Sequence, residues 1–226
     1  MNVAIAPSPL PAVPRRALTA VRALATVLRD PGRLDQVLVF TQAVNARAIE
    51  RGVARLAATE EGRRLLEDAP RIDRAHVDYD RLRTLPDGTL GRAYTRFLDA
   101  NGIGPEPFEA LPDIGSPRAA WLMLRMRQSH DLWHVLTGYA PDVRGELLLQ
   151  AFTYAQTEAP SARAIAFFGT LRYGLRLEHL RDLRDAYRRG RAAAFLPTVR
   201  WEDEWETPVR ELQTRFGIVP REATFS

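Results

Sequence analysis

The sequence predicts an all-α fold, and three observations favour this fold class. Apolar residues recur at intervals of three and four along most of the chain, which is the repeat of helices with one buried face. Ser, Thr or Asp stands where several of these repeats begin, and Pro or Gly stands where they end. The sequence has no convincing strand pattern, internal repeat or glycine-rich phosphate loop. We therefore expect a single-domain helical bundle built around one buried helix.

Composition limits the function classes that fit this chain. Its 226 residues are the length of one domain, and its 46% hydrophobic and 27% charged residues are ordinary for a soluble globular protein. All 32 basic side chains are arginine, and the formal net charge is only +4. This charge does not choose between nucleic acid, an anionic membrane and an acidic substrate, but no recognition motif is found, so we expect no nucleic-acid partner. Because there is no cysteine, disulfides and sulfur-ligated structural zinc sites are excluded.

Residues 1–14 are expected to be a flexible, proline-rich lead-in to one domain over residues 15–226. Four prolines interrupt the lead-in, and it lacks the basic start of a signal peptide. No run of about 18 apolar residues is present, so we expect no transmembrane helix.

Three helical repeats open the domain and are expected to wall the core. They span residues 15–29, 34–57 and 60–67. Asp30-Pro31-Gly32 ends the first of them, and Thr59 is placed to cap the third. His76 then stands in a polar, loop-like region. A further helix ends near Asn101-Gly102, and the proline-rich segment 104–116 is expected to be a surface loop.

A strongly apolar helix, which we expect to be central and buried, is predicted from Pro117 to Thr137. Ser116 is placed to be its N-cap, and proline is favoured at the first helical position that follows. Gly138 is placed to end the helix in the left-handed conformation that glycine tolerates.

The rest of the chain is expected to form helices as well. Asp142 caps a helix over 143–157, and a long helix runs from Pro160 through Leu177. Small and aromatic residues alternate in that long helix, which favours either a groove for an elongated apolar ligand or ordinary helix packing. His179 and the charge-rich stretch 181–191 are expected on the surface. The acidic residues of 201–208 open a last helix.

Two of the four histidines lie four residues apart in the predicted central helix. This spacing places His130 and His134 on one helix face, with Cβ atoms about 5–6 Å apart. Glu146, twelve positions after His134, falls in the first turns of an antiparallel neighbouring helix and is the third candidate ligand. Imidazole and carboxylate suit zinc, iron or manganese, and such a set leaves coordination positions open for substrate or water. The pattern indicates a catalytic metal site.

Several alternatives stay open at this site. Asp131 is either a fourth ligand or an acceptor that orients a histidine ring. It is shorter than the glutamate general base of HExxH metalloproteases, which disfavours a protease. Without a metal, His130 and His134 would be two satisfied, partly buried histidines. Arg127, about one turn earlier on the same stripe, either binds a carboxylate or phosphate or forms a structural ion pair.

The stretch His130-Asp131-Leu132-Trp133-His134, followed by Glu146 after eleven intervening residues, resembles the hallmark of the coenzyme Q (ubiquinone) biosynthesis family of the Coq-four type. The flanking sequence agrees with this family at residues 85–94, 125–129, 136–138, 145–146 and 201–218. The resemblance covers about residues 34–220, and only the proline-rich N-terminus departs from it.

This resemblance implies a helical, peripherally membrane-associated protein that binds polyprenylated quinone precursors. It implies a divalent metal, zinc with Fe²⁺ or Mn²⁺ as alternatives, held by His130, Asp131, His134 and Glu146. The implied reaction removes the C1 carboxylate of a 4-hydroxy-3-methoxy-5-polyprenylbenzoate-type precursor, with hydroxylation at that carbon. Glu146, Asp131 and Arg127 are then the catalytic candidates. We expect a cytoplasmic protein on the inner face of the membrane, working with other coenzyme Q biosynthesis proteins, and a homodimer is compatible with this expectation.

A second function class fits the same features. Zinc is redox-inert and cannot supply the oxidation, so another metal or a partner protein would have to do so. The alternative is a non-catalytic scaffold that binds prenylated intermediates and presents them to partner enzymes. Glu146 separates the two functions, because a scaffold could lose it with lipid binding intact and a catalyst could not lose it without losing turnover.

Overall fold

The computed structural model describes residues 13–30, 33–104, 116–174 and 176–221, and the all-α prediction is confirmed for this part of the chain. It contains eleven α-helices, two short 3-10 helices and no strand, and one isolated β-bridge joins Thr89 to Pro208. The helices are α1 (Val13–Arg29), α2 (Leu34–Ala57), α3 (Glu60–Asp68), α4 (Tyr79–Thr84), α5 (Leu90–Ala100), α6 (Pro117–Gln128), α7 (His130–Thr137), α8 (Val143–Thr157), α9 (Pro160–Arg172), α10 (Leu177–Ala192), η1 (Leu196–Thr198), η2 (Trp201–Asp203) and α11 (Val209–Phe216).

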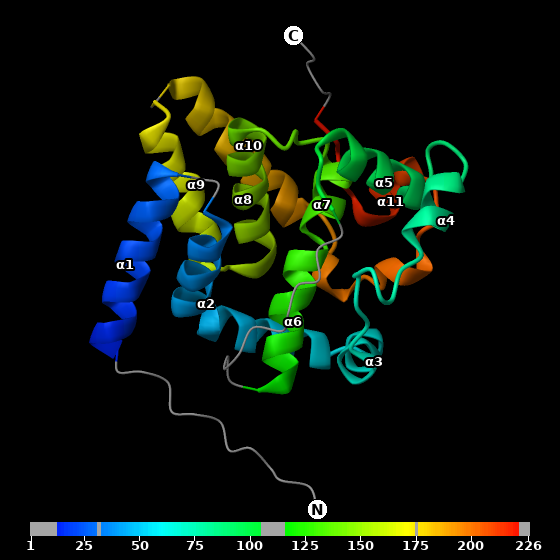
Figure 1. Ribbon diagram of the computed structural model, residues 1–226, viewed down its shortest axis with the longest axis horizontal. Coiled ribbons are helices and arrows are strands. Elements are labelled where there is room, and N and C mark those ends of the chain that lie inside the picture. Colours follow the sequence, from blue (N-terminus) through cyan, green and yellow to red (C-terminus); the bar gives the residue numbers. More distant parts are fainter. Residues whose placement is uncertain (1–12, 31–32, 105–115, 175, 222–226) are drawn as a thin grey trace, which may run out of the picture.

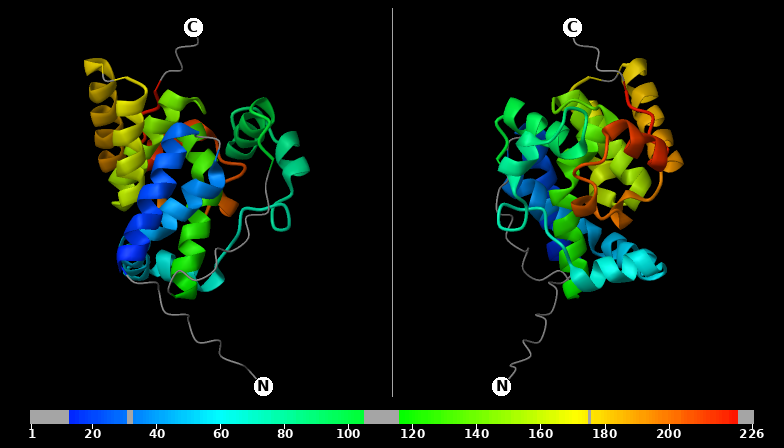
Figure 2. Two further views of the ribbon diagram at one scale, coloured as in Figure 1. Left: turned by 60° about the vertical axis from the view of Figure 1, so that its left-hand side comes forward. Right: turned by 90° about the vertical axis from the view of Figure 1, so that its right-hand side faces the viewer.

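The helices surround a central pair formed by α6 and α7. Figure 1 shows α6 and α7 following one another through the middle of the molecule, with α1, α2, α8, α9 and α10 on one side. Within that group α1 packs along α2, and α8 packs against α9 and α10. The left view of Figure 2 shows α4 and α5, in teal and green, set apart from α1 and α2, in blue. Because α5, α8 and α11 all contact α7, the short helix α7 lies at the centre of the fold.

The largest core cluster of the described residues surrounds α7. Leu132, Trp133 and Leu136 are almost fully buried there, and Trp133 meets Phe152 of α8 edge to face with ring centroids 6.0 Å apart. Each large apolar side chain contributes about 1.5–3 kcal/mol by leaving water. Isolated helices shorter than about 12–15 residues are marginal in water, so packing rather than intrinsic propensity stabilises the eight residues of α7.

Three predicted N-caps are confirmed by hydrogen bonds at the helix starts. Their side chains accept a backbone N–H as follows: Thr59 from Gly62, Ser116 from Ala119 and Asp142 from Gly145. Each bond satisfies one of the N–H groups that has no partner inside its helix. These caps fix the starts of α3, α6 and α8 at the predicted positions.

The prediction of one continuous helix from Pro117 to Thr137 is wrong. The helix is interrupted at Ser129, which separates α6 from α7. The Ser129 hydroxyl donates to the Arg125 carbonyl oxygen at 2.9 Å, and the Ser129 N–H donates to the same oxygen. A serine hydroxyl that bonds four residues back often bends a helix, which accounts for the interruption.

Three other boundaries differ from prediction. The helix that starts at Pro160 ends at Arg172 rather than continuing through Leu177, and Gly174 follows in a backbone conformation with φ of +102°. The last α-helix begins at Val209, because the acidic stretch before it forms η2 and a turn. The short helix α4 was not predicted.

Two predicted segments fall mostly outside the described residues. Of the lead-in predicted over 1–14, residues 1–12 lie outside the described part, and the final two residues already belong to α1. Of the loop predicted over 104–116, residues 105–115 also lie outside it.

A buried ion pair ties α6 to the C-terminal part of the chain. Arg125 is 1% exposed, and its Nη2 donates to Glu202 at 2.7 Å and to the Val199 carbonyl oxygen at 3.2 Å. Its Nη1 donates to the other Glu202 oxygen, so the guanidinium and the carboxylate form a paired contact. Removing Glu202 would leave the Arg125 charge uncompensated in the protein interior.

Replacing Glu202 by glutamine should therefore destabilise the fold strongly. Glu202→Gln leaves the buried Arg125 cation without its counter-charge, and we expect a loss of about 3 kcal/mol in the free energy of unfolding, measured by urea denaturation. The matched control is Asp68→Asn, which breaks the exposed Arg200–Asp68 pair and should cost less than about 1 kcal/mol. Equal effects of the two substitutions would contradict the proposed role of burial.

Candidate metal centre

A tight turn after α7 brings Glu146 back to the two histidines. Gly138 ends α7 in the left-handed conformation with φ of +71°. A Cβ atom at Gly145 would lie 1.9 Å from the Ala140 carbonyl oxygen, so α8 can start immediately after the turn only with glycine at this position. Glu146 follows in the first turn of α8. From there its carboxylate faces His130 and His134 of α7, as predicted from the short connection.

Three of the predicted ligands form one compact cluster. His134 Nε2 lies 3.1 Å from Glu146 Oε1, and His130 Nε2 lies 3.3 Å from Glu146 Oε2. The two imidazole rings meet edge to face with centroids 4.9 Å apart. One ligand atom from each of the three side chains falls within 4.8 Å of the others. Among the described residues, this is the only group of three or more His, Asp or Glu side chains that could hold one metal ion.

The ring of His134 is fixed by contacts that the sequence analysis did not identify. Its Nδ1 lies 2.8 Å from the Tyr139 carbonyl oxygen, which can only accept a hydrogen bond, so Nδ1 carries the proton. Nε2, the other ring nitrogen, points toward Glu146. Phe97 of α5 stacks on the same ring with centroids 5.4 Å apart. A backbone carbonyl has no residue-type signature, so only the position of Tyr139 directly after the helix end could have suggested this contact.

The electrostatics of the cluster favour an ionised carboxylate. Burial by itself raises the pKa of Glu146, but the hydrogen bonds from His130 and His134 outweigh it and hold that pKa well below its usual range. For His130, burial lowers the pKa, and the contact with Glu146 more than offsets this, so the net shift is upward. A carboxylate that stays ionised and two inward-facing imidazole nitrogens are the donor types that a divalent metal requires.

Asp131 and Arg127 occupy different positions from the three clustered side chains. Asp131 lies in the first turn of α7 but is not among the three residues whose ligand atoms converge. Its pKa is raised, mainly because it is partly buried, while the charges on His130 and His134 oppose the shift. Arg127 lies in the last turn of α6, before the interruption, and partial burial lowers its pKa. Both remain candidates whose roles the geometry of the cluster does not assign.

The chemistry of the donor set fits a catalytic rather than a structural metal. Two imidazoles and one carboxylate supply three ligands, and a fourth position would stay open for water or substrate. The same ligand types bind Zn²⁺, Fe²⁺ and Mn²⁺, so the side chains do not select one of these metals.

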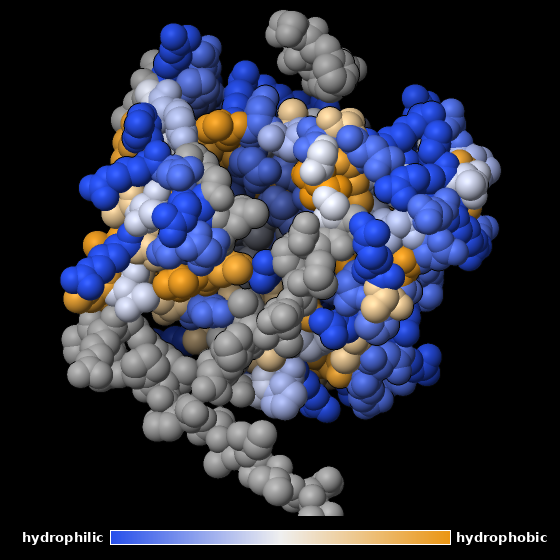
Figure 3. Space-filling view, in the orientation of Figure 1, coloured by the Kyte–Doolittle hydropathy of each residue, from blue (hydrophilic) through white to orange (hydrophobic). Residues whose placement is uncertain are grey.

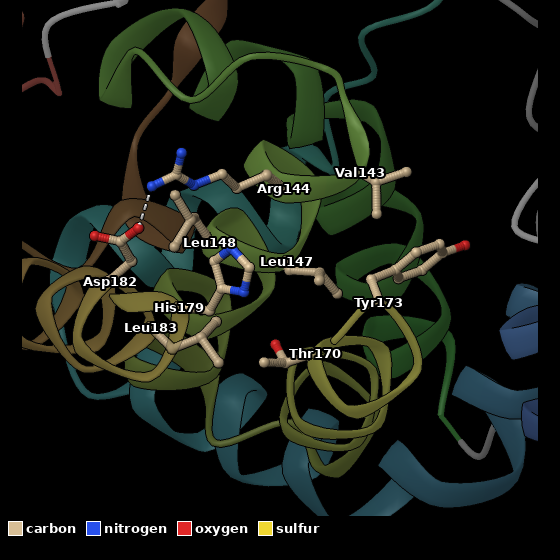
Figure 4. Close-up of a pocket in the computed structure, with 9 residues that line it drawn as sticks. All are labelled: Val143, Arg144, Leu147, Leu148, Thr170, Tyr173, His179, Asp182 and Leu183. Carbon is tan, nitrogen blue, oxygen red and sulfur yellow. Dashed lines mark hydrogen bonds and ion pairs between the residues drawn. The ribbon is translucent and has the colours of Figure 1, made fainter. Parts of the chain in front are cut away.

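A separate cavity of about 250 Å³ lies between α8, α9 and α10. Figure 4 shows Leu147, Leu148 and Leu183 in its wall, with Arg144 paired to Asp182 at one side. His179, predicted to lie on the surface, also lines this cavity. Its lining residues are Val143, Arg144, Leu147, Leu148, Thr170, Tyr173, His179, Asp182 and Leu183. None of the three clustered metal-ligand candidates lines it.

Comparison with known proteins gives one consistent result. The family model described as "Coenzyme Q (ubiquinone) biosynthesis protein Coq4" matches residues 7–222. The mitochondrial ubiquinone biosynthesis protein COQ4 of Coprinopsis cinerea is 33% identical over 205 residues, which is 89% of this chain and 70% of that protein. The human COQ4 homolog, also named as mitochondrial, is 31% identical over 213 residues, which is 92% of this chain and 80% of that protein.

A solved structure agrees with these relatives. The crystal structure of a Nostoc punctiforme protein assigned to ubiquinone biosynthesis superposes with a TM-score of 0.70 at 27% identity. The similarity covers 90% of this chain and 97% of that one.

Removing one histidine of the cluster should strongly weaken metal binding. We expect the purified protein to bind one divalent ion per chain, and His134→Asn to weaken binding by more than about 100-fold, because loss of a ligand exceeds the cost of losing an outer-shell partner. Elemental analysis after dialysis measures the bound metal. His179→Asn is the matched control and should retain it, since His179 lies in the separate cavity. Undiminished metal in His134→Asn would show that the cluster is not the binding site.

Proposed function

Because the chain belongs to the coenzyme Q (ubiquinone) biosynthesis protein Coq4 family, we propose that it removes the C1 carboxylate of a polyprenylated hydroxybenzoate during ubiquinone biosynthesis. The observation that carries this proposal is the convergence of His130, His134 and Glu146 at the centre of the fold. A 4-hydroxy-3-methoxy-5-polyprenylbenzoate-type precursor has the carboxylate that such a site could bind. The metal dependence of the reaction is part of the proposal.

The three clustered residues would hold a divalent metal, which acts as a Lewis acid toward oxygen ligands. The Tyr139 carbonyl holds the His134 ring so that Nε2 faces Glu146, and a metal would bind at that nitrogen without rotation of the ring. Arg127 is proposed to pair with the anionic substrate, because it lies one turn before His130 and carries a guanidinium suited to a carboxylate. Asp131 is proposed either as a further ligand or as an acceptor for a histidine ring.

The electron count separates two forms of the reaction. Loss of carbon dioxide leaves an electron pair on C1, and in a simple decarboxylation a proton takes up this pair. Placing a hydroxyl group on C1 instead requires a two-electron oxidant in addition. Zinc cannot supply it, so the oxidative form needs a redox-active metal such as Fe²⁺ together with an oxidant, or a partner protein of the pathway.

The polyprenyl tail requires an apolar environment, and we propose that the protein meets its substrate at a membrane surface. Each methylene of the tail gains about 0.8 kcal/mol on leaving water. Phe167, Phe168, Leu171 and Tyr173 of the α9 end are 53%, 41%, 40% and 45% exposed, which is unusual for neighbouring large apolar side chains. Figure 3 shows further orange hydrophobic patches on the side of the molecule that carries α1. Peripheral contact with the inner face of the cytoplasmic membrane is the proposed location.

No helix among the described residues has both the length and the apolar character needed to cross a bilayer.

Polar substitutions on α9 should weaken membrane contact. We expect the double variant Phe167→Ser/Phe168→Ser to lose most of its co-sedimentation with phosphatidylcholine–phosphatidylglycerol vesicles, because it removes two exposed aromatic side chains. Val219→Ser, which removes an exposed apolar side chain near the C-terminal end of the described chain, is the control. The proposed contact face is wrong if the double variant and the control sediment alike.

The decisive test of the reaction is turnover by a Glu146 variant. Glu146→Gln keeps the side-chain shape but removes the negative charge, and we expect the rate of carbon dioxide release from a prenylated 4-hydroxy-3-methoxybenzoate to fall by about 10²–10³-fold. Glu158→Gln, in the exposed C-cap of the same helix, should leave the rate unchanged. Unchanged pathway flux and lipid binding in Glu146→Gln would instead support the non-catalytic scaffold.

A further inference from the structure

The C-terminal end of α7 is held by a segment that follows it by more than 70 residues. The last carbonyl oxygens of a helix have no partner inside that helix. In α7, the Leu136 carbonyl oxygen accepts from Gln213 Nε2 at 2.9 Å, and the Thr137 carbonyl oxygen accepts from the Arg221 N–H at 2.8 Å. The segment Gln213–Arg221 therefore supplies hydrogen-bond donors to two consecutive carbonyl oxygens of α7.

This segment also fits closely against the turn that follows α7. A Cβ atom at Gly138 would lie 2.4 Å from the Arg221 carbonyl oxygen, so backbone meets backbone at this point. Gly138 is also in the left-handed conformation that side chains disfavour. The end of α7 and the turn at residues 138–139 thus have little freedom to move relative to Arg221.

The turn carries the group that orients His134. Its last residue, Tyr139, accepts the Nδ1 proton of His134 at 2.8 Å through its carbonyl oxygen. A shift of the turn would move this acceptor and rotate the imidazole, whose Nε2 faces Glu146. His134 is 1% exposed, so no water could readily replace the lost contact.

We propose that the segment Gln213–Arg221 is a positioning element for His134: by holding the carbonyls of Leu136 and Thr137, it fixes the turn whose Tyr139 carbonyl sets the tautomer and direction of the imidazole. Gln213 is the key side chain of this element. It is a positioning residue rather than a catalytic one, because it acts through the turn and not on the substrate. Its effect on a bound metal rests on the proposed function, whereas its effect on the ring of His134 does not.

The backbone contacts around Gln213 do not depend on its side chain, so this side chain can be replaced without disturbing the end of α11. The Ile218 N–H donates to the Gln213 carbonyl oxygen at 2.8 Å, and Gly217 ends α11 in the left-handed conformation, so α11 keeps its own closing contacts when the side chain changes. Methionine matches the shape of glutamine but has no donor. Gln213→Met therefore removes the hydrogen bond to Leu136 with little change in volume.

A matched control is available in α8. Gln156 is buried, donates to the Gly190 carbonyl oxygen at 2.6 Å and accepts from the Leu196 N–H at 2.9 Å, and neither contact touches α7. Gln156→Met should destabilise the fold at least as much as Gln213→Met, because it removes two buried hydrogen bonds rather than one. Gln156→Met therefore separates general destabilisation of the fold from an effect on α7.

Two measurements test the proposal. In the metal-free protein, the ¹⁵N resonances of the His134 ring report its tautomer and hydrogen bonding, and we expect them to shift in Gln213→Met and to stay unchanged in Gln156→Met. In chelator competition, Gln213→Met should bind Zn²⁺ about tenfold more weakly than the unmodified protein. The visible absorption of the Co²⁺-substituted protein should change shape for Gln213→Met and keep its shape for Gln156→Met.

The outcomes distinguish this proposal from the proposed function. Unchanged His134 resonances in Gln213→Met would overturn the positioning role whether or not metal binds. Shifted resonances in a protein that binds no metal would support the positioning role while contradicting the metal-dependent function. Equal loss of metal affinity in both variants would show that destabilisation alone accounts for the effect and would overturn the role of Gln213.

Discussion

The imidazole of His134 is constrained at both ring nitrogens, and the geometry of the site depends on this constraint. The Tyr139 carbonyl takes the Nδ1 proton, and Glu146 lies opposite Nε2. Phe97 stacks on one face of the ring, with ring centroids 5.4 Å apart. A metal-binding histidine whose ring is held in one orientation presents the same nitrogen to the site before any ligand arrives, so binding requires little rotation of the ring.

This constraint relies on contacts that come from distant parts of the chain. The start of α7 follows Arg125, which is paired with Glu202 in the interior, and its end is bonded to Gln213 and Arg221. An eight-residue helix has too few internal hydrogen bonds to hold a site by itself. The C-terminal part of the protein thus stabilises the same helix whose histidines face Glu146.

Helix α8 borders two different chemical environments. Glu146 faces α7, whereas Leu147, the next residue, packs against Gly169 of α9. Successive helical residues point about 100° apart, so one helix can present a carboxylate to a polar cluster and an aliphatic side chain to an apolar neighbour. The exposed aromatic residues Phe167 and Phe168 directly precede Gly169 in α9. The proposed substrate, with a carboxylate on its ring and a long hydrocarbon tail, would need both environments within one small domain.

The sequence by itself determined the parts of the protein that depend on short-range geometry. The i, i+4 spacing of His130 and His134, the turn before Glu146 and the caps at Ser116 and Asp142 involve residues close in the chain, and helix periodicity and backbone hydrogen bonding fix them locally. Only the tertiary structure decided the rest. The interruption at Ser129 and the end of α9 break helices whose sequence pattern continues, and the orientation of His134 relies on a carbonyl that any residue type could provide. Gln213 reaches Leu136 across 77 positions, and a contact of that range depends on how helices pack, which neither spacing nor composition encodes.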